Sequence, residues 1–200
     1  MAADGPRVEH FDLRYDAARH VRLQPGAHHL DLGKFRHGCS LAWAMPLAGT
    51  PPPSYDRNDI ADLVNKALVR GLPDEWGIYQ TLGLQIAGDE RLCLPAFVVV
   101  PRDAPRACKT HALSTHALLV VEITSKRNVT ADLAAKRDAY ARGGVDVYLL
   151  IDGWHEPWPR VTVYSEPVDC DYQYSVTKPF GETIHVPKPI DLSLDTSRFH

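Results

Sequence analysis

One carboxylate stands out in this sequence because of the apolar residues that precede it. Glu122 follows the apolar run 117–121 and is itself followed by Ile123. An unpaired carboxylate is costly to bury, and the ends of strands in α/β sheets are where ligands and metals usually gather. Glu122 is therefore a candidate functional residue. The alternative is a carboxylate that pairs with an Arg or Lys at the surface.

A polar stripe follows on the next predicted helix, residues 130–142. Asp132, Lys136 and Tyr140 are spaced four residues apart, so they lie on roughly one face of that helix. We expect any active site in this chain to be centred on Glu122 and Lys136. The alternative for the stripe is an exposed Asp132–Lys136 ion pair that stabilises the helix by about 0.3–0.5 kcal/mol.

The elements around these residues predict a crossover unit. The run 117–123 is apolar on both faces, as a central strand covered on two sides should be. Thr130 can cap the helix, and Gly143-Gly144 is suited to end it in left-handed geometry. A second apolar strand follows over 147–151. A strand, a helix and a strand of this length predict two parallel strands joined by a right-handed crossover.

The flanking sequence predicts further elements of a single α/β domain. Apolar residues at helical spacing predict a helix over 56–70, ended by Gly71 and Pro73. Alternation predicts one strand over 78–86 with Leu82, Leu84 and Ile86 on one face. Strands are also predicted over 97–100, 161–164 and 172–174, and an extended, Pro-rich tail from 187.

Residues 118–152 read LLVVEITSKRNVTADLAAKRDAYARGGVDVYLLID. They fit an apolar strand ending in Glu-Val-x-Ser, a loop, Asp-x3-Lys-x3-Tyr, Ala-x-x-Gly-Val and a strand ending in Asp. This text resembles the Uma-two family of restriction-endonuclease-like proteins, with weaker similarity over 45–101. The matching positions are Glu122, Ser125, Asp132, Lys136, Tyr140, Gly144, Val145 and Asp152.

The resemblance implies the PD-(D/E)XK nuclease fold, a restriction-endonuclease-like core with a mixed central sheet flanked by helices. It implies a metal-dependent DNA endonuclease in which carboxylates bind Mg²⁺ or Mn²⁺, with Glu122 as the metal ligand here. The superfamily's usual lysine would stand at Thr124. Lys136 would instead orient the water and the phosphate, with Asp132, Tyr140 and Ser125 in support.

The sequence departs from the family pattern in two places. The family motif Pro-Asp reads Pro95-Ala96 here, so the expected first metal carboxylate is missing at Ala96. The family's early Glu is also missing, since no Glu stands between Glu9 and Glu75. Three explanations stay open: a pseudo-nuclease that lost its metal, an engineered inactivation at position 96, and a scaffold reused for other chemistry. The alternative function is a catalytically silent protein that binds nucleic acid or another protein.

Charge distribution bears on the partner. The chain carries a net charge of −3, while residues 102–142 hold eight Lys or Arg and four acids. A local basic region can meet a polyanion such as DNA even when the whole chain is acidic. The alternative is an ordinary solvated surface. A homodimer is also plausible, since symmetric pairing is common.

The remaining features favour a cytoplasmic protein organised as one domain over 1–200. The expected parts are a divergent N-terminal stretch, a core over 51–165, and a C-terminal meander and tail over 166–200. There is no apolar run long enough for a membrane span and no signal-peptide pattern at the start. The four cysteines form no CxxC pair, which favours reduced thiols. Two side features are a weak zinc pattern at His28, His29, His37 and Cys39, and Trp154 and Trp158, which could stack on bases but are expected to pack on the meander.

Overall fold

A computed structural model describes residues 54–106, 108–124 and 130–200, and for residues 130–132 it describes the backbone alone. The candidate zinc residues of the first 50 positions, and Ser125, therefore lie outside the described residues.

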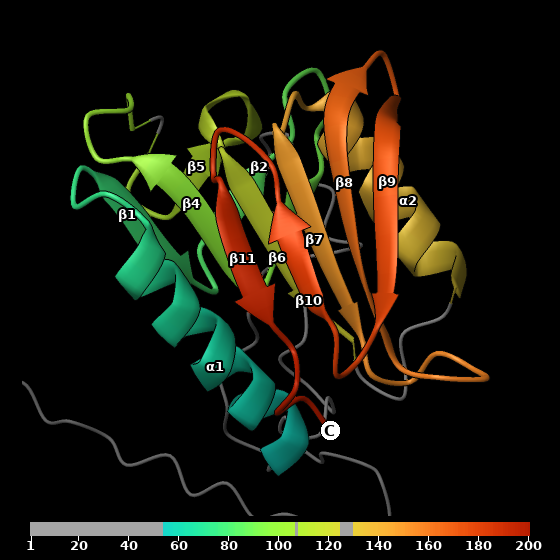
Figure 1. The fold of residues 1–200 in the computed structure, drawn as a ribbon. Coiled ribbons are helices and arrows are strands. Elements are labelled where there is room, and N and C mark those ends of the chain that lie inside the picture. Colours follow the sequence, from blue (N-terminus) through green and yellow to red (C-terminus); the bar gives the residue numbers. More distant parts are fainter. Residues whose placement is uncertain (1–53, 107, 125–129) are drawn as a thin grey trace, which may run out of the picture.

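A six-stranded mixed sheet forms the centre of the fold (Figure 1). Its central pair, β6 and β7, is parallel, with Val121 opposite Leu149, and every other neighbouring pair in this sheet is antiparallel. The predicted parallel crossover is therefore confirmed, and so is the predicted mixed sheet. In spatial order the strands are β1 (Trp76–Gln80), β4 (Phe97–Pro101), β6 (Leu119–Ile123), β7 (Val147–Asp152), β8 (Arg160–Val168) and β9 (Asp171–Pro179).

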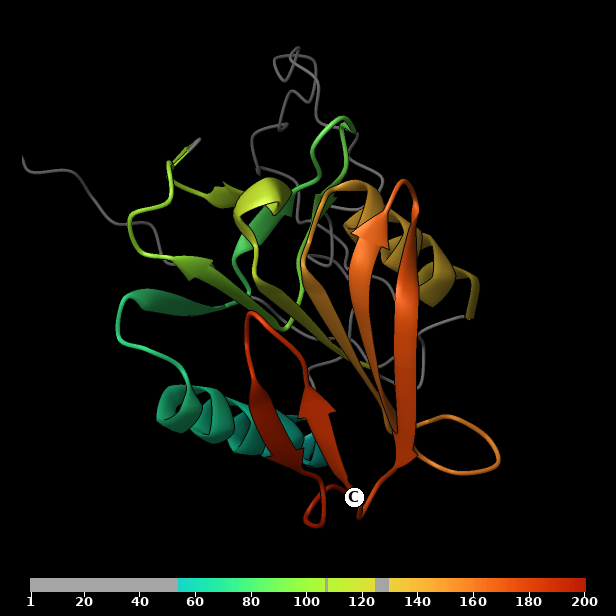
Figure 2. The same cartoon turned by 45° about the horizontal axis from the view of Figure 1, so that its top comes forward.

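One face of this sheet is covered by helix α1 (Tyr55–Gly71) and by the hairpin of β10 (Thr183–Val186) and β11 (Leu192–Asp195) (Figures 1 and 2). The apolar stripe of α1 is buried there, as its helical spacing predicts. The Ser54 hydroxyl caps the helix by accepting a hydrogen bond from the Arg57 amide. The α1-side core that results includes Ile60, Val64, Leu68, Val121, Leu149, Val163, Ile184 and Leu194.

The opposite face is covered by helix α2 (Thr130–Arg142) and by a small sheet of β2 (Gly83–Gln85), β3 (Leu92–Cys93) and β5 (His111–Leu113). The chain leaves β5 through a 3-10 turn, Ser114–His116, and enters β6. Neither helix of the described residues is long and apolar enough to cross a membrane. The α2-side core includes Leu84, Ile86, Val98, Val120, Ala139, Tyr140, Tyr148 and Leu150.

The prediction of one strand over 78–86 is wrong. The chain turns at Thr81, whose φ of 52° lies in the left-handed region, and β1 and β2 join different sheets. Leu84 and Ile86 are buried together, as their alternation predicts. The tail after residue 187 is also more ordered than predicted, because β11 pairs with β10. Alternation of apolar and polar residues indicates which side chains are buried, but it does not indicate which strands are neighbours in a sheet.

Ser114 fastens the C-terminal end of α2 to the small sheet. Its fully buried hydroxyl donates to the carbonyl oxygen of Gly143 at 2.7 Å and accepts from the Ala87 amide at 2.9 Å. The contact is so close that a Cβ at Gly143 would lie 2.6 Å from the Ser114 hydroxyl oxygen. Gly144, with φ of 72°, then ends the helix in the predicted left-handed geometry. The end of α2 is thereby held in place.

We expect Ser114→Ala to lower the free energy of unfolding by about 1–3 kcal/mol, because it leaves a buried donor and a buried acceptor unsatisfied. Urea unfolding followed by circular dichroism measures the change. The matched control is Thr115→Ala at the exposed neighbouring position, which should change stability by less than about 0.5 kcal/mol. Equal effects of the two substitutions would contradict the role given to Ser114.

Candidate active site

Glu122 lies inside β6, on the face that carries α2. It shares that face with Val120, two residues earlier in the strand, and its side chain is nearly inaccessible to solvent. A carboxylate in such a position requires partners, since burial without them is strongly unfavourable. Both partners come from α2.

Lys136 and Tyr140 bind the same oxygen of Glu122. The Lys136 ammonium lies 3.0 Å from Glu122 Oε1, and the Tyr140 hydroxyl donates to that oxygen at 2.7 Å. The two side chains are one helical turn apart, so they point the same way. The predicted meeting of Glu122 and Lys136 is therefore present. An ammonium cannot accept a hydrogen bond, so the Tyr140 hydroxyl cannot donate to Lys136 directly. The two side chains are linked through the carboxylate oxygen of Glu122 that both of them bind.

The environment keeps the Tyr140 hydroxyl protonated. Burial raises the pKa of Tyr140 well above its ordinary value, and the charge of nearby Glu122 raises it further. The phenol therefore serves as a fixed hydrogen-bond donor over the whole physiological pH range. Asp132 lies on the same helix, but its side chain is outside the described residues.

Cys93 of β3 is a neighbour that the sequence did not indicate. Together with Arg91, Ala135, Lys136 and Ala139 it lines a small hollow beside the cluster. Burial raises the pKa of the Cys93 thiol to about 11, and Glu122 contributes to the rise. The thiol is thus neutral at physiological pH. No local pattern could have placed it there, because β3 comes to the site through pairing with β2.

Thr124 and Asp152 are joined at the carboxyl ends of the two parallel strands. The Thr124 hydroxyl donates to Asp152 Oδ1 at 2.9 Å, and the Trp154 amide donates to the same oxygen at 3.3 Å. His155 Nδ1 lies 3.9 Å from Asp152 Oδ2. Thr124, at the position of the superfamily's usual lysine, therefore helps to fix Asp152 and the start of the loop that follows β7.

Ala96 lies one residue before β4, whose Phe97 pairs with Val121. Position 96 is therefore close in register to Glu122. The Ala96 side chain is half-buried and packs against the α1-side core, and its carbonyl oxygen accepts from the Thr81 amide. A methyl group offers no ligand atom, so this position contributes only its backbone.

The side chains described here do not fit a divalent cation. Mg²⁺ is held through several hard oxygen ligands in octahedral geometry. Glu122 is a single carboxylate whose Oε1 already binds Lys136 and Tyr140. Within residues 54–106, 108–124 and 133–200, no three His, Cys, Asp or Glu side chains are grouped so that they could hold a metal ion. The assignment of Glu122 as a metal ligand remains a prediction.

The predicted basic region, residues 102–142, is divided in the structure. Lys126 and Arg127 lie outside the described residues. Four others have partners: Lys136 with Glu122, Arg137 with Asp138, Arg142 with Asp89, and Arg102 with the carbonyl oxygen of Asp74. Arg106 and Lys109 are exposed, and none of the ion pairs among the described side chains includes them. Among the described side chains of this region, Arg106 and Lys109 have neither an ion pair nor a hydrogen bond of the kind that holds Arg102.

The fold is that of a nuclease-like α/β protein. The structure is similar to the crystal structure of "a putative nuclease belonging to DUF820" from Anabaena variabilis, with a TM-score of 0.54 and 14% sequence identity over 74% of this chain and 84% of that chain. At this identity the similarity concerns the fold. Residues 42–197 match the model of the Uma2 family, described as "Putative restriction endonuclease". The chain belongs to the Uma2 family. The search of curated proteins found no match.

A double-mutant cycle tests the Glu122–Lys136 pair. Lys136→Met leaves a buried carboxylate without its cation, and we expect it to lower the free energy of unfolding by about 3 kcal/mol. Glu122→Gln should cost less, because Lys136 is partly exposed and can turn toward water. The double variant should be more stable than the sum of the single effects predicts, by about 1 kcal/mol or more. Denaturant unfolding of all four proteins measures the coupling.

The matched control is the exposed pair of Lys66 and Asp62 on α1, both about half exposed. Lys66→Met should cost less than about 0.5 kcal/mol, since surface ion pairs contribute little. Additive effects at Glu122 and Lys136 would show that the two groups do not stabilise one another.

The Cys93 thiol predicts a stability change at alkaline pH. A thiol has an ordinary pKa near 9, and in the folded protein this one is raised to about 11. The folded state therefore holds the proton more tightly, so the contribution is intact below pH 9 and is lost as the pH rises through 11. We expect the free energy of unfolding to fall over this range, and Cys93→Ala to make the fall shallower. Equal slopes for the two proteins would contradict the burial of Cys93.

Proposed function

We propose that this protein binds DNA at the sheet edge where β6 and β7 end, and that it does not hydrolyse the phosphodiester bond while position 96 is alanine. The observation that carries the proposal is the buried pair of Glu122 and Lys136 beside a position that offers no second carboxylate. Membership of the Uma2 family supports DNA as the partner.

The residues at this edge suit a nucleic acid. Lys136 is partly exposed and brings an ammonium to the cluster. Trp154 and Trp158, expected from the sequence to pack on the meander, are nearly half exposed in the loop that follows β7, and Trp158 lies edge-on to His155. Aromatic faces of this kind stack on bases without regard to sequence. The proposal therefore assigns the phosphate to Lys136 and base stacking to the indole rings of the loop that follows β7.

The same residues are poorly suited to hydrolysis. Phosphodiester cleavage depends on positioning and on neutralising the charge that develops on phosphate. The positive charge of Lys136 is already balanced by Glu122 at 3.0 Å. Among the described side chains, the cluster has no second carboxylate that could recruit a divalent cation to supply the missing charge. Binding can persist under these conditions, whereas cleavage cannot.

Restoring the carboxylate tests the proposal. We expect Ala96→Asp to bind Mn²⁺ and to cleave plasmid DNA in its presence, because it adds a second carboxylate close in register to Glu122. Metal binding is measured by calorimetry and cleavage by gel electrophoresis. Ala96→Asn, of the same shape without the charge, and the double variant Ala96→Asp/Glu122→Gln should show neither.

The unmodified protein is measured alongside. It should bind single-stranded DNA with an affinity that falls steeply as salt rises, and it should leave plasmid intact with Mg²⁺ or Mn²⁺. Cleavage by the unmodified protein that is lost in Glu122→Gln would overturn the proposal in favour of an active nuclease. A folded Ala96→Asp protein that gains neither metal nor cleavage would show that position 96 is not the missing element.

A further inference from the structure

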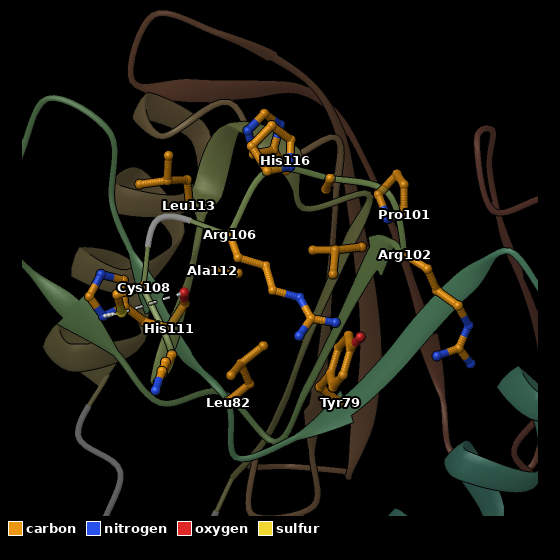
Figure 3. Close-up of a pocket in the computed structure, with 14 residues that line it drawn as sticks. Tyr79, Leu82, Pro101, Arg102, Arg106, Cys108, His111, Ala112, Leu113 and His116 are labelled. Carbon is orange, nitrogen blue, oxygen red and sulfur yellow. Dashed lines mark hydrogen bonds between the residues drawn. The ribbon is translucent and has the colours of Figure 1, made fainter.

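A cavity of about 150 Å³ lies away from the Glu122 cluster, between the edge of the central sheet and the small sheet (Figure 3). It is lined by Tyr79 of β1, the end of β4, the loop that follows β4, and β5. His116, which also lines it, precedes β6, whereas Glu122 is near that strand's other end. Leu119 to Glu122 alone spans about 10 Å of extended chain. The cavity is therefore a separate site.

The interior of the cavity is mainly apolar. Leu82, Val100, Ala112 and Leu113 contribute to its walls. An apolar cavity of about this volume in another protein holds a single benzene ring. The space here therefore matches one aromatic ring and is too small for two fused rings with substituents.

The mouth of the cavity is positively charged. Arg106 extends across it, with its guanidinium end toward Tyr79 (Figure 3). Lys109 also lines the cavity, and neither Arg106 nor Lys109 is in an ion pair among the described side chains. No Asp or Glu is among the described residues that line the cavity. An anionic group at the mouth would therefore meet positive charge without a competing carboxylate.

Polar groups converge on one side of the same cavity. Cys108 Sγ lies 2.9 Å from His111 Nδ1, and the Thr110 amide donates to Cys108 Sγ at 3.3 Å. These bonds hold Cys108 and His111 in place (Figure 3). The hydrogen bonds from Thr110 also lower the pKa of the Cys108 thiol. A few fixed polar groups in an apolar pocket are what orient a small ligand.

We propose that this cavity binds a pyrimidine nucleotide unit, with the single ring inside and the phosphate at Arg106 and Lys109. The volume of the cavity fits one ring, and the two cations favour a phosphate. The polar side at Cys108 and His111 suits a ring that carries hydrogen-bond donors and acceptors on its edge. A phenyl ring would offer that side no hydrogen-bonding group. The inference goes beyond DNA binding at the Glu122 edge and does not rest on it.

Calorimetric titration of the full chain tests the assignment. Thymidine monophosphate should bind. Guanosine monophosphate has two fused rings and thymidine has no phosphate, so we expect each to bind at least about tenfold more weakly. A 5′-phosphorylated oligothymidylate, compared with the free nucleotide, shows whether the natural source is a single strand or a free nucleotide. Inorganic phosphate and phenyl phosphate are titrated in parallel.

Two variants keep the test independent of folding. Arg106→Gln, at an exposed position, should weaken thymidine monophosphate binding about tenfold through loss of a charge-assisted contact. Leu82→Trp should abolish binding by filling the cavity. Arg70→Gln, an exposed arginine on α1, is the matched control and should bind normally. Binding that is unchanged in Arg106→Gln and Leu82→Trp but lost in Lys136→Met would place the nucleotide at the Glu122 edge, so that failure of the Glu122 proposal and failure of this one are distinguishable.

Three results would overturn the inference. Equal binding of inorganic phosphate would show that no ring enters the cavity. Equal binding of phenyl phosphate would assign the site to aryl phosphates such as phosphotyrosine. Unchanged binding in both Arg106→Gln and Leu82→Trp would place the nucleotide elsewhere on the protein.

Discussion

The carboxylate of Glu122, buried within an apolar strand, is the constraint on which the rest of this structure depends. A charge in that position is tolerated only with partners. Lys136 and Tyr140 supply them from successive turns of α2, so α2 must cross the sheet directly above Glu122. Ala139, buried between these turns, lets the helix approach closely. The parallel crossover from β6 to β7 is the connection that puts α2 in this place.

The contacts of Glu122 also require that the C-terminal end of α2 is held in place. A salt bridge and a hydrogen bond to one oxygen tolerate little displacement of the backbone that carries them. Ser114 binds the carbonyl oxygen of Gly143, just after the last turn of α2, and also the amide of Ala87 beside the small sheet. The small sheet thus acts as a brace for α2. The same sheet forms one wall of the cavity near Arg106, so the brace and the second site share their architecture.

The crossover could be predicted from the sequence because its signals are local. Apolar runs and the glycines after Arg142 each act within a few residues, and the spacing of Lys136 and Tyr140 on one helix face placed both beside Glu122. The predictions that failed depend on contacts between residues that are far apart in the sequence. The turn falls on Thr81, a residue type that does not signal left-handed geometry, so β1 and β2 were predicted as one strand. Cys93 and the cavity could not be predicted, because strand pairing and loop packing bring their parts together. The importance of Ala96 came from the family resemblance alone.

Charge balance explains why alanine at position 96 is compatible with a stable fold. With one carboxylate, Lys136 neutralises the cluster and no bound ion is required. A second carboxylate at position 96 would leave an excess negative charge in a region shielded from water. One of the two acids would then take up a proton or a cation would have to bind. In the present arrangement the charge of Glu122 is balanced by Lys136 without a bound ion. A protein with such a site can hold its shape at the edge proposed to bind DNA whether or not divalent ions are present, and a role in binding would require this.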